Sequence, residues 1–401
     1  MPDEGRPEEG RTGAAPRATL RELALLFLRL GVTAFGGPAA HVALMETEVV
    51  RRRRWMSSDR FLDLFGAASL IPGPSSTELA IFIGHEQAGW LGLLVGGVCF
   101  ILPASLMVTA LAWAYVRYGT LPQVAGVLYG IKPVVIAIVV QALWGLAPKA
   151  IKRSAWLGAL GLLAGGASAL GADAFLVLLG GGVAALLASQ VARRKDVARS
   201  INPSIVAGIV TGGASVAVPV TMGALFLTFL KIGAVVFGSG YVLLAFLRAD
   251  LVDRLHWLTE PQLLDAVAIG QVTPGPVFTT ATFIGYVVAA SEGPAAGVRG
   301  AVVATVGIFL PGFLLVAIVR PLVARLRKSP VAGAFLDGVN VAALALMAVV
   351  TVQLARAALV DAPTILLALA GAVALIRFKL NTTWLVAVGA LLGVAIEAIR
   401  Q

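Results

Sequence analysis

Charged residues are scarce in this 401-residue chain, because Asp, Glu, Lys and Arg together make up only 13% of it. A soluble domain carries roughly 25% charged residues, so this scarcity excludes an ordinary soluble protein. Aromatic residues are also few, at 7%, whereas hydrophobic residues reach 59% and the mean hydropathy is +0.92. The apolar runs are continuous and do not alternate with polar residues, which indicates helices and not the strands of a barrel. We therefore predict an all-α polytopic membrane protein with about 10–13 transmembrane helices.

Residues that could carry enzyme or metal chemistry are equally sparse. Cys99 is the only cysteine, which excludes an internal disulfide and a multi-cysteine metal site. The three histidines, His41, His85 and His256, show no metal-ligand spacing, and neither a phosphate-binding glycine loop nor a metalloprotease helix motif occurs. We therefore expect no enzyme activity, no metal, no cofactor and no ATP-driven pumping by this chain.

The charges that do occur lie in short clusters between the apolar runs. The formal net charge is +10, and the strongest basic cluster is Arg51–Arg54. Such clusters set the orientation of membrane proteins, so we expect membrane lipid as a partner and no nucleic acid. Residues 1–19 are polar without an apolar core, so we interpret them as a disordered tail and not as a signal peptide. A charged linker at 193–202 divides the rest into two domains, 20–192 and 203–401.

Two identical helix breakers stand inside apolar runs, Pro72-Gly73-Pro74 and Pro274-Gly275-Pro276. Proline removes a backbone N–H and clashes with the preceding turn, so neither run can be one continuous helix. The two breaks are 202 residues apart, and the same spacing joins Gly31 to Gly233, Phe35 to Phe237, Gly36 to Gly238, Trp55 to Trp257 and Asp63 to Asp265. A spacing of 208 joins Leu102-Pro103 to Leu310-Pro311 and Gly130-Ile131-Lys132 to Gly338-Val339-Asn340. These matches in register predict an internal repeat.

The loop charges predict that the two halves have opposite orientations in the membrane. The first half has basic loops at 51–54, 149–153 and 193–199, whereas the second half has a balanced loop at 248–256 and basic loops at 320–328 and 377–379. If each Pro-Gly-Pro segment enters and leaves at one face, opposite orientations satisfy the positive-inside rule throughout. Inverted repeats with broken helices near the midplane are typical of secondary transporters.

Hydroxyl residues follow both breaks. A helix that begins inside the protein presents free N–H groups and the positive end of its dipole, and hydroxyls beside them suit a tetrahedral oxyanion. A single break could be only a packing kink, but two matching breaks followed by hydroxyls favour binding. The predicted substrate site therefore comprises these residues and the nearby glycine-rich breaks: Ser75, Ser76, Thr77, Thr279, Thr280, Gly36, Gly37, Gly238 and Ser239.

Several charges lie within apolar runs, where burying them is costly. Arg29 and Lys231 occupy the same position in the two halves. They could neutralise a bound anion, or they could snorkel to the membrane surface. Lys132 could bind the anion or couple its transport, or it could pair with a buried carboxylate; its counterpart in the second half is Asn340.

Acidic residues near the breaks allow further alternatives. Glu78 directly follows the hydroxyls of the first break. It could carry a coupling proton, or it could pair with Arg29 or Lys132. Asp63 and Asp265 each precede a break by nine residues, and we interpret them as residues at helix starts and not as ligands.

These stretches together resemble the chromate ion transporter family. In the first half the similar stretches are Phe35-Gly36-Gly37-Pro38-Ala39-Ala40-His41, Glu46 to Trp55, Leu70 to Thr77, and Gly130-Ile131-Lys132-Pro133. In the second half they are Phe237-Gly238-Ser239-Gly240-Tyr241 and Gln271-Val272-Thr273-Pro274-Gly275-Pro276. The resemblance covers roughly residues 20–395, as in the long, two-domain form of the family. Glu78 departs from it, because we expect a neutral Gln at this position.

The resemblance implies a multi-pass carrier of the inner membrane that exports chromate and confers chromate resistance. Members of the family are commonly interpreted as secondary carriers driven by the membrane potential or a proton gradient, and an antiporter is one such carrier. A carrier of sulfate or another oxyanion is an alternative, because chromate and sulfate share shape and charge, and an oxyanion channel is another. The chain could also form a homodimer.

Overall fold

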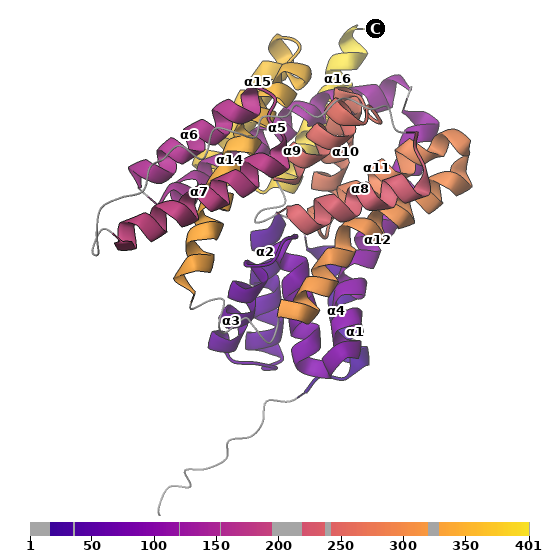
Figure 1. The fold of residues 1–401 in the computed structure, drawn as a ribbon. Coiled ribbons are helices and arrows are strands. Elements are labelled where there is room, and N and C mark those ends of the chain that lie inside the picture. The colour runs from indigo at the N-terminus through magenta and orange to yellow at the C-terminus, as the bar shows by residue number, and fades with distance from the viewer. Residues whose placement is uncertain are drawn as a thin grey trace, which may run out of the picture.

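The computed structural model describes residues 17–34, 37–119, 121–152, 154–194, 219–236, 242–319 and 329–400. Within these ranges every regular element is a helix (Figure 1). Six helices are long and apolar enough to cross a membrane, and four shorter apolar helices accompany them. The predicted all-α polytopic membrane fold is therefore confirmed.

The first helix begins at a well-formed cap. The Thr19 and Glu22 side chains bond to each other's backbone N–H groups and form a capping box. Just before it, the Ala18 N–H donates to Gln87 Oε1 at 3.1 Å. Of the tail predicted at 1–19, residues 17–19 lead into this cap, and residues 1–16 lie outside the described ranges. The elements of the first half are α1 (Leu20–Thr33), α2 (Gly37–Glu46), the π-helix η1 (Thr47–Arg52), α3 (Ser58–Ala68), α4 (Ser75–Tyr118), α5 (Pro122–Ile151), α6 (Ala155–Ala169) and α7 (Ala174–Arg194).

The second half has a similar order of elements. Its predicted linker overlaps the end of α7 at residues 193 and 194, and the rest of the linker lies outside the described ranges. The elements are α8 (Met222–Val235), α9 (Leu243–Leu247), the π-helix η2 (Arg248–Arg254), α10 (Glu260–Val272), the 3₁₀ turn η3 (Val277–Thr279), α11 (Thr280–Ala289), the 3₁₀ turn η4 (Ala290–Glu292), α12 (Pro294–Val319), α14 (Pro330–Ala358), α15 (Ala362–Phe378) and α16 (Thr382–Arg400).

Positions 202 residues apart share unusual backbone conformations. Arg54 and His256 have φ angles of +54° and +53°, and each closely follows a π-helix, η1 or η2. Gly73 and Gly275 in the two breaks have φ angles of +128° and +93°, which glycine adopts freely and other residues rarely do. The chain therefore turns in the same way at corresponding places in its two halves.

The segment behind each break folds back on a longer helix. In α4 the backbone leaves the helical conformation at Gly89, where φ is +61°. The parts on either side of it pack antiparallel, and a Cβ atom on Gly84 or Gly92 would collide with the backbone of the other. Glycines permit such close helix contacts in lipid. The second half has the same arrangement between α11 and α12, at Gly285, Gly293 and Gly300.

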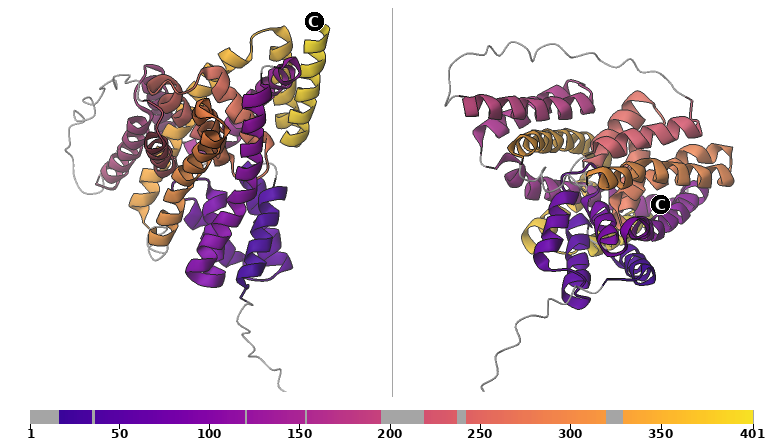
Figure 2. Two further views of the ribbon diagram at one scale, coloured as in Figure 1. Left: turned by 90° about the vertical axis from the view of Figure 1, so that its right-hand side faces the viewer. Right: turned by 60° about the horizontal axis from the view of Figure 1, so that its bottom comes forward.

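The last helices of each half pack on the other half. The helices α6 and α7 pack against α14, whereas α15 and α16 pack against α5. Close glycine pairs support both contacts, with Gly130 of α5 against Gly389 of α16 and Gly338 of α14 against Gly181 of α7. Figure 1 and the left view of Figure 2 show α1–α3 at one end of the molecule and α15 and α16 at the opposite end.

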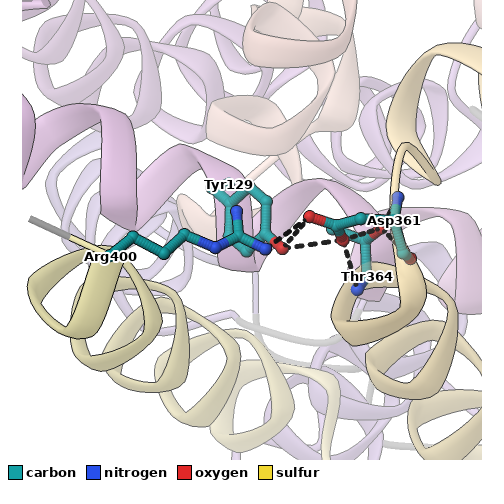
Figure 3. Close-up of polar contacts among 4 residues, drawn as sticks. All are labelled: Tyr129, Asp361, Thr364 and Arg400. Atoms are coloured by element: carbon teal, nitrogen blue, oxygen red, sulfur yellow. Dashed lines mark hydrogen bonds and ion pairs between the residues drawn. The ribbon is translucent and has the colours of Figure 1, made fainter.

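A polar cluster around Asp361 ties α5, α15 and α16 together. Asp361 caps α15 by accepting from the Thr364 N–H at 3.0 Å, and its carboxylate also accepts from the Tyr129 hydroxyl at 2.7 Å. Arg400 completes the cluster with an ion pair at 2.6 Å (Figure 3). Desolvation alone would raise the pKa of Asp361, but the hydrogen bonds from Arg400, Tyr129 and Thr364 outweigh it and hold that pKa well below its usual range.

Replacing this carboxylate should weaken the fold in a pH-dependent way. Asp361→Asn should cost about 1 kcal/mol at neutral pH, a modest loss because the Arg400 side chain is 43% exposed. A carboxyl with a lowered pKa stabilises the fold above its unfolded-state pKa and loses this effect as the pH falls toward its folded-state pKa. Thermal unfolding in detergent should therefore separate variant from wild type at neutral pH and progressively less below about pH 4. An equal difference in unfolding temperature between variant and wild type at neutral pH and below about pH 4 would contradict this account.

Candidate functional site

The two Pro-Gly-Pro breaks each bond to the opposite half of the chain. The Gly73 N–H donates to the Val236 carbonyl at 2.7 Å, and the Gly275 N–H donates to the Ala34 carbonyl at 3.0 Å. Ala34 and Val236 are the residues at which α1 and α8 end, and they too are 202 residues apart. The exchange is therefore reciprocal, because the break in each half satisfies a carbonyl at a helix end in the other.

A buried histidine supports the second of these contacts, the one at the Ala34 carbonyl. His41 of α2 is 1% exposed, with Nε2 3.0 Å from the Ala34 carbonyl and Nδ1 3.3 Å from Ser76 Oγ. A carbonyl oxygen can only accept, so in the neutral ring Nε2 carries the hydrogen and Nδ1 accepts from the Ser76 hydroxyl. Sequence reasoning considered His41 only as a metal ligand and missed this role, since its partners are 7 and 35 residues away.

The helix α4 begins at Ser75, directly behind the first break. Its N-cap is Pro74, which has no side chain able to cap the helix. Ser75 is half-buried, whereas Ser76 and Thr77 are buried. In the described part of the chain, the Thr77 hydroxyl has no hydrogen-bond partner. This terminus therefore combines an uncapped helix end with an unused hydroxyl.

Glu78 lies in the same first turn and is 1% exposed. Its carboxyl folds back against Gly73, and it also lies against Gly312 of α12, because a Cβ atom on either glycine would collide with Oε1. Its Oε2 is buried without a hydrogen-bond partner among the described residues. Neither of the predicted ion pairs, with Arg29 or with Lys132, forms in the structure. Glu78 is thus a buried carboxyl at the contact between the two halves.

The hydroxyls behind the second break are also buried, but they are bonded locally. Thr279 Oγ1 donates to the Pro276 carbonyl and Thr280 Oγ1 to the Val277 carbonyl, each at 2.8 Å. The first turn here is the 3₁₀ turn η3, which differs from the direct α-helical start at Ser75. The structure therefore places hydroxyls behind both breaks, with those of the second half already used by the backbone.

Lys132 of α5 forms an ion pair that crosses the two halves. Its Nζ lies 2.9 Å from Oδ1 of Asp265 in α10, and Asp265 Oδ2 accepts from the Tyr115 hydroxyl of α4 at 2.9 Å. Of the two alternatives for Lys132, the structure thus has the pair with a buried carboxylate. The interpretation of Asp265 as a helix-start residue is wrong, because it lies inside α10 and is only 5% exposed. Asp63 likewise lies inside α3, which begins at Ser58.

The other predicted cations have different surroundings. Lys231 pairs with Asp250 of η2 at 2.7 Å, and Arg254 lies 3.0 Å from the same carboxylate oxygen. Arg29, the counterpart of Lys231, is exposed. Asp250 and Arg254 also line a polar cavity of about 240 Å³ between η2, α14 and the loop before α7.

The remaining predicted site residues can be placed only in part. Asn340 is exposed on α14, and Gly37 is the first residue of α2. Gly36, Gly238 and Ser239 lie outside the described residues. Within the described part of the chain, no group of three or more His, Cys, Asp or Glu side chains could hold a metal ion.

A methyl group at the second break should disrupt the contact between the halves. Gly275→Ala would force alanine to a φ of +93° and bring its Cβ within 2.6 Å of the Ala104 Cβ. We expect lower thermal stability and loss of any transport activity that depends on this contact between the halves. Gly223→Ala is the matched control, because a Cβ atom there meets nothing within 4 Å. Equal unfolding temperatures for the two variants would contradict the importance of this contact.

Comparison with known sequences gives matches over both halves. The sequence profile described as "Chromate transporter" matches residues 21–217 and 223–394. A chromate transport protein of Cupriavidus metallidurans is 35% identical over 387 residues, which are 96% of this chain and 95% of the relative. One of Pseudomonas aeruginosa is 32% identical over 357 residues, 85% of this chain and 82% of the relative.

A shorter protein is also similar. An uncharacterized transporter of Bacillus subtilis is 28% identical over 135 residues, which are 34% of this chain but 76% of that relative. No solved structure matches the chain. The family profile covers both halves, and the resemblance first seen at the Pro-Gly-Pro breaks is confirmed along almost the whole length. The chain belongs to the chromate transporter family.

Proposed function

We propose that this chain is a secondary carrier that exports chromate from the cytoplasm across the inner membrane and so gives chromate resistance. The family and the names of the relatives support chromate as the substrate. The observation that carries the proposal is the reciprocal pair of hydrogen bonds by which Gly73 and Gly275 each bind a helix end of the opposite half. Broken helices that meet within the membrane are where secondary transporters bind their substrates and coupling ions.

In this proposal the domains 20–192 and 203–401 are inverted repeats. The reciprocal bonds at the breaks and the reciprocal packing of α6 and α7 on α14, and of α15 and α16 on α5, support a twofold relation. The alternating loop charges support opposite orientations in the membrane. The shorter relative, of which the match covers 76%, supports a unit of about half this chain.

The proposed substrate site lies between the start of α4 and the start of η3 and α11. On one side Ser75, Ser76 and Thr77 supply hydroxyls beside an uncapped helix end, which suits a tetrahedral dianion. On the other side Thr279 and Thr280 would have to turn their hydroxyls away from local carbonyls to donate to the same ion. The hydroxyls of the second half would thus reorient when the ion binds, whereas the Thr77 hydroxyl of the first half has no partner among the described residues.

The cations would add positive potential near the two breaks. Arg29 and Lys231 lie one turn before the ends of α1 and α8, although Lys231 is partly offset by Asp250. Asn340 would take the place of a cation on α14 and offer a neutral hydrogen-bond donor. This uneven supply of charge would distinguish the two sides of the carrier.

Glu78 is the residue that we propose to couple transport to protons. An ionised carboxylate beside a bound dianion is repelled by it, and burying such a carboxylate without a partner costs several kcal/mol. Glu78 is buried in the first turn of α4, and its Oε2 has no hydrogen-bond partner among the described residues. Chromate can therefore bind there only when Glu78 carries a proton, so the dianion and one proton would leave together with a net charge of −1, and a membrane potential that is negative inside would drive their export.

Uptake of labelled chromate into everted inner-membrane vesicles tests the function. We expect uptake that needs the chain, that slows when an imposed pH gradient with an alkaline lumen is collapsed, and that excess sulfate reduces less than unlabelled chromate does. Stronger inhibition by sulfate than by chromate would assign the carrier to sulfate. Uptake that does not depend on the gradient of any second ion would indicate a channel. Absence of uptake would rule out the proposed function.

Glu78→Gln should separate transport from its coupling. Gln is similar in size but cannot take up a proton, so chromate exchange between the two sides should persist while stimulation by a pH gradient is lost. The control is Glu46→Gln, because Glu46 is a partly exposed partner of Arg51 at the surface. Unchanged pH-gradient stimulation in Glu78→Gln would exclude this residue as the coupling group.

A further inference from the structure

The Lys132–Asp265 ion pair differs from the surface ion pairs in where it lies and what it joins. It connects α5 of the first half with α10, the helix that leads into the second break. The side chains are 20% and 7% exposed, so the carboxylate is buried while the Lys132 side chain is partly exposed. An ammonium group has three N–H donors, and in the described part of the chain Asp265 is the one anion within ion-pair distance of Lys132.

We propose that Lys132 is a second binding point for the oxyanion and that Asp265 is its internal competitor. The inference rests on the proposed transport of chromate. When the site is empty, the Asp265 carboxylate occupies Lys132. When a tetrahedral dianion arrives from the solvent side, it takes over the ammonium group, and the tie between α5 and α10 opens.

This binding point is separate from the one at the helix breaks. Asp265 precedes Pro274 by nine residues, which corresponds to roughly 13 Å along a helix at 1.5 Å per residue. No described contact joins Lys132 to the hydroxyls behind either break. In this proposal an ion therefore binds Lys132 in a separate step, before or after it reaches the hydroxyls.

Tyr115 makes the exchange of partners physically reasonable. A buried carboxylate that loses its only partner is strongly destabilised, but Asp265 keeps the hydrogen bond from the Tyr115 hydroxyl at 2.9 Å when Lys132 leaves. Among the described residues, Lys132 of α5 and Tyr115 of α4 are the titratable groups that contact this carboxylate. No charged side chain from α11, α14 or η2, which also pack on α10, contributes a described ion pair or hydrogen bond to it.

The corresponding place in the other half lacks the cation. The residue 208 positions after Lys132 is Asn340, and the carboxylate 202 positions before Asp265 is Asp63. An amide carries no charge to attract a dianion, so the internal competition exists on one side only. In this proposal the first half therefore offers a charged binding point at Lys132, and the second half offers a neutral residue, Asn340, at the corresponding position.

The test is the binding of chromate to purified protein, followed by calorimetry in detergent. Asp265→Asn removes the competitor and should tighten chromate binding by about fivefold, the scale of a partly exposed ion pair. Lys132→Gln should weaken binding at least about tenfold, and the double variant should bind as weakly as Lys132→Gln alone. Asp63→Asn is the matched control and should leave the affinity unchanged.

Chromate binding by Asp265→Asn that is no tighter than in the wild type overturns the proposal. A purely structural ion pair predicts that Asp265→Asn loses thermal stability and binds chromate no more tightly than the wild type. Tyr115→Phe provides a second test if Asp265→Asn does not fold, because Asp265 would then depend more on Lys132. Weaker chromate binding in Tyr115→Phe supports the competition, whereas equal or tighter binding refutes it. Absence of chromate binding by the wild type would instead refute the proposed function.

Discussion

The reciprocal backbone hydrogen bonds from each break to a helix end of the opposite half are the constraint on which the rest of this structure depends. A helix that stops inside a membrane leaves carbonyl groups without partners, and lipid offers none. Here the last carbonyls of α1 and α8 are satisfied by Gly275 and Gly73 of the opposite half. The geometry needs positive φ angles at both glycines, and the flanking prolines keep the chain from continuing as a helix. Each half therefore depends on the other for a complete set of hydrogen bonds.

The breaks, the spacing of corresponding residues and the all-helical membrane fold could be predicted from the sequence, because proline, glycine and long apolar runs act locally. The contacts of individual polar residues could not. His41 bonds to Ala34 and Ser76 only because α2 folds back on the end of α1 and the start of α4. Asp265 looked like a helix-start residue, since nothing near it in sequence shows that α5 brings Lys132 to it. The packing of α15 and α16 on α5 likewise depends on contacts between residues more than 200 positions apart, such as Gly130 and Gly389.

The few charges of this chain serve distinct purposes. At the π-helices, Glu48 and Asp250 are buried and paired with nearby arginines, Arg52 and Arg254, which stabilises the turns that carry the positive φ angles. Around Asp361, a cluster of neutral and charged groups joins three helices. Glu78 and Lys132 differ from these, because Oε2 of the buried Glu78 carboxyl has no hydrogen-bond partner among the described residues and the Lys132 side chain is partly exposed. In a membrane protein such groups are the first candidates for handling ions.

The most direct measurement of the central claim is the position of chromium in crystals of the protein with bound chromate, located from its anomalous X-ray scattering. The account predicts a peak between Ser75 and Thr280, beside the start of α4, and a weaker one next to Lys132. A single peak remote from both breaks, or no peak at a chromate concentration that saturates transport, would contradict it.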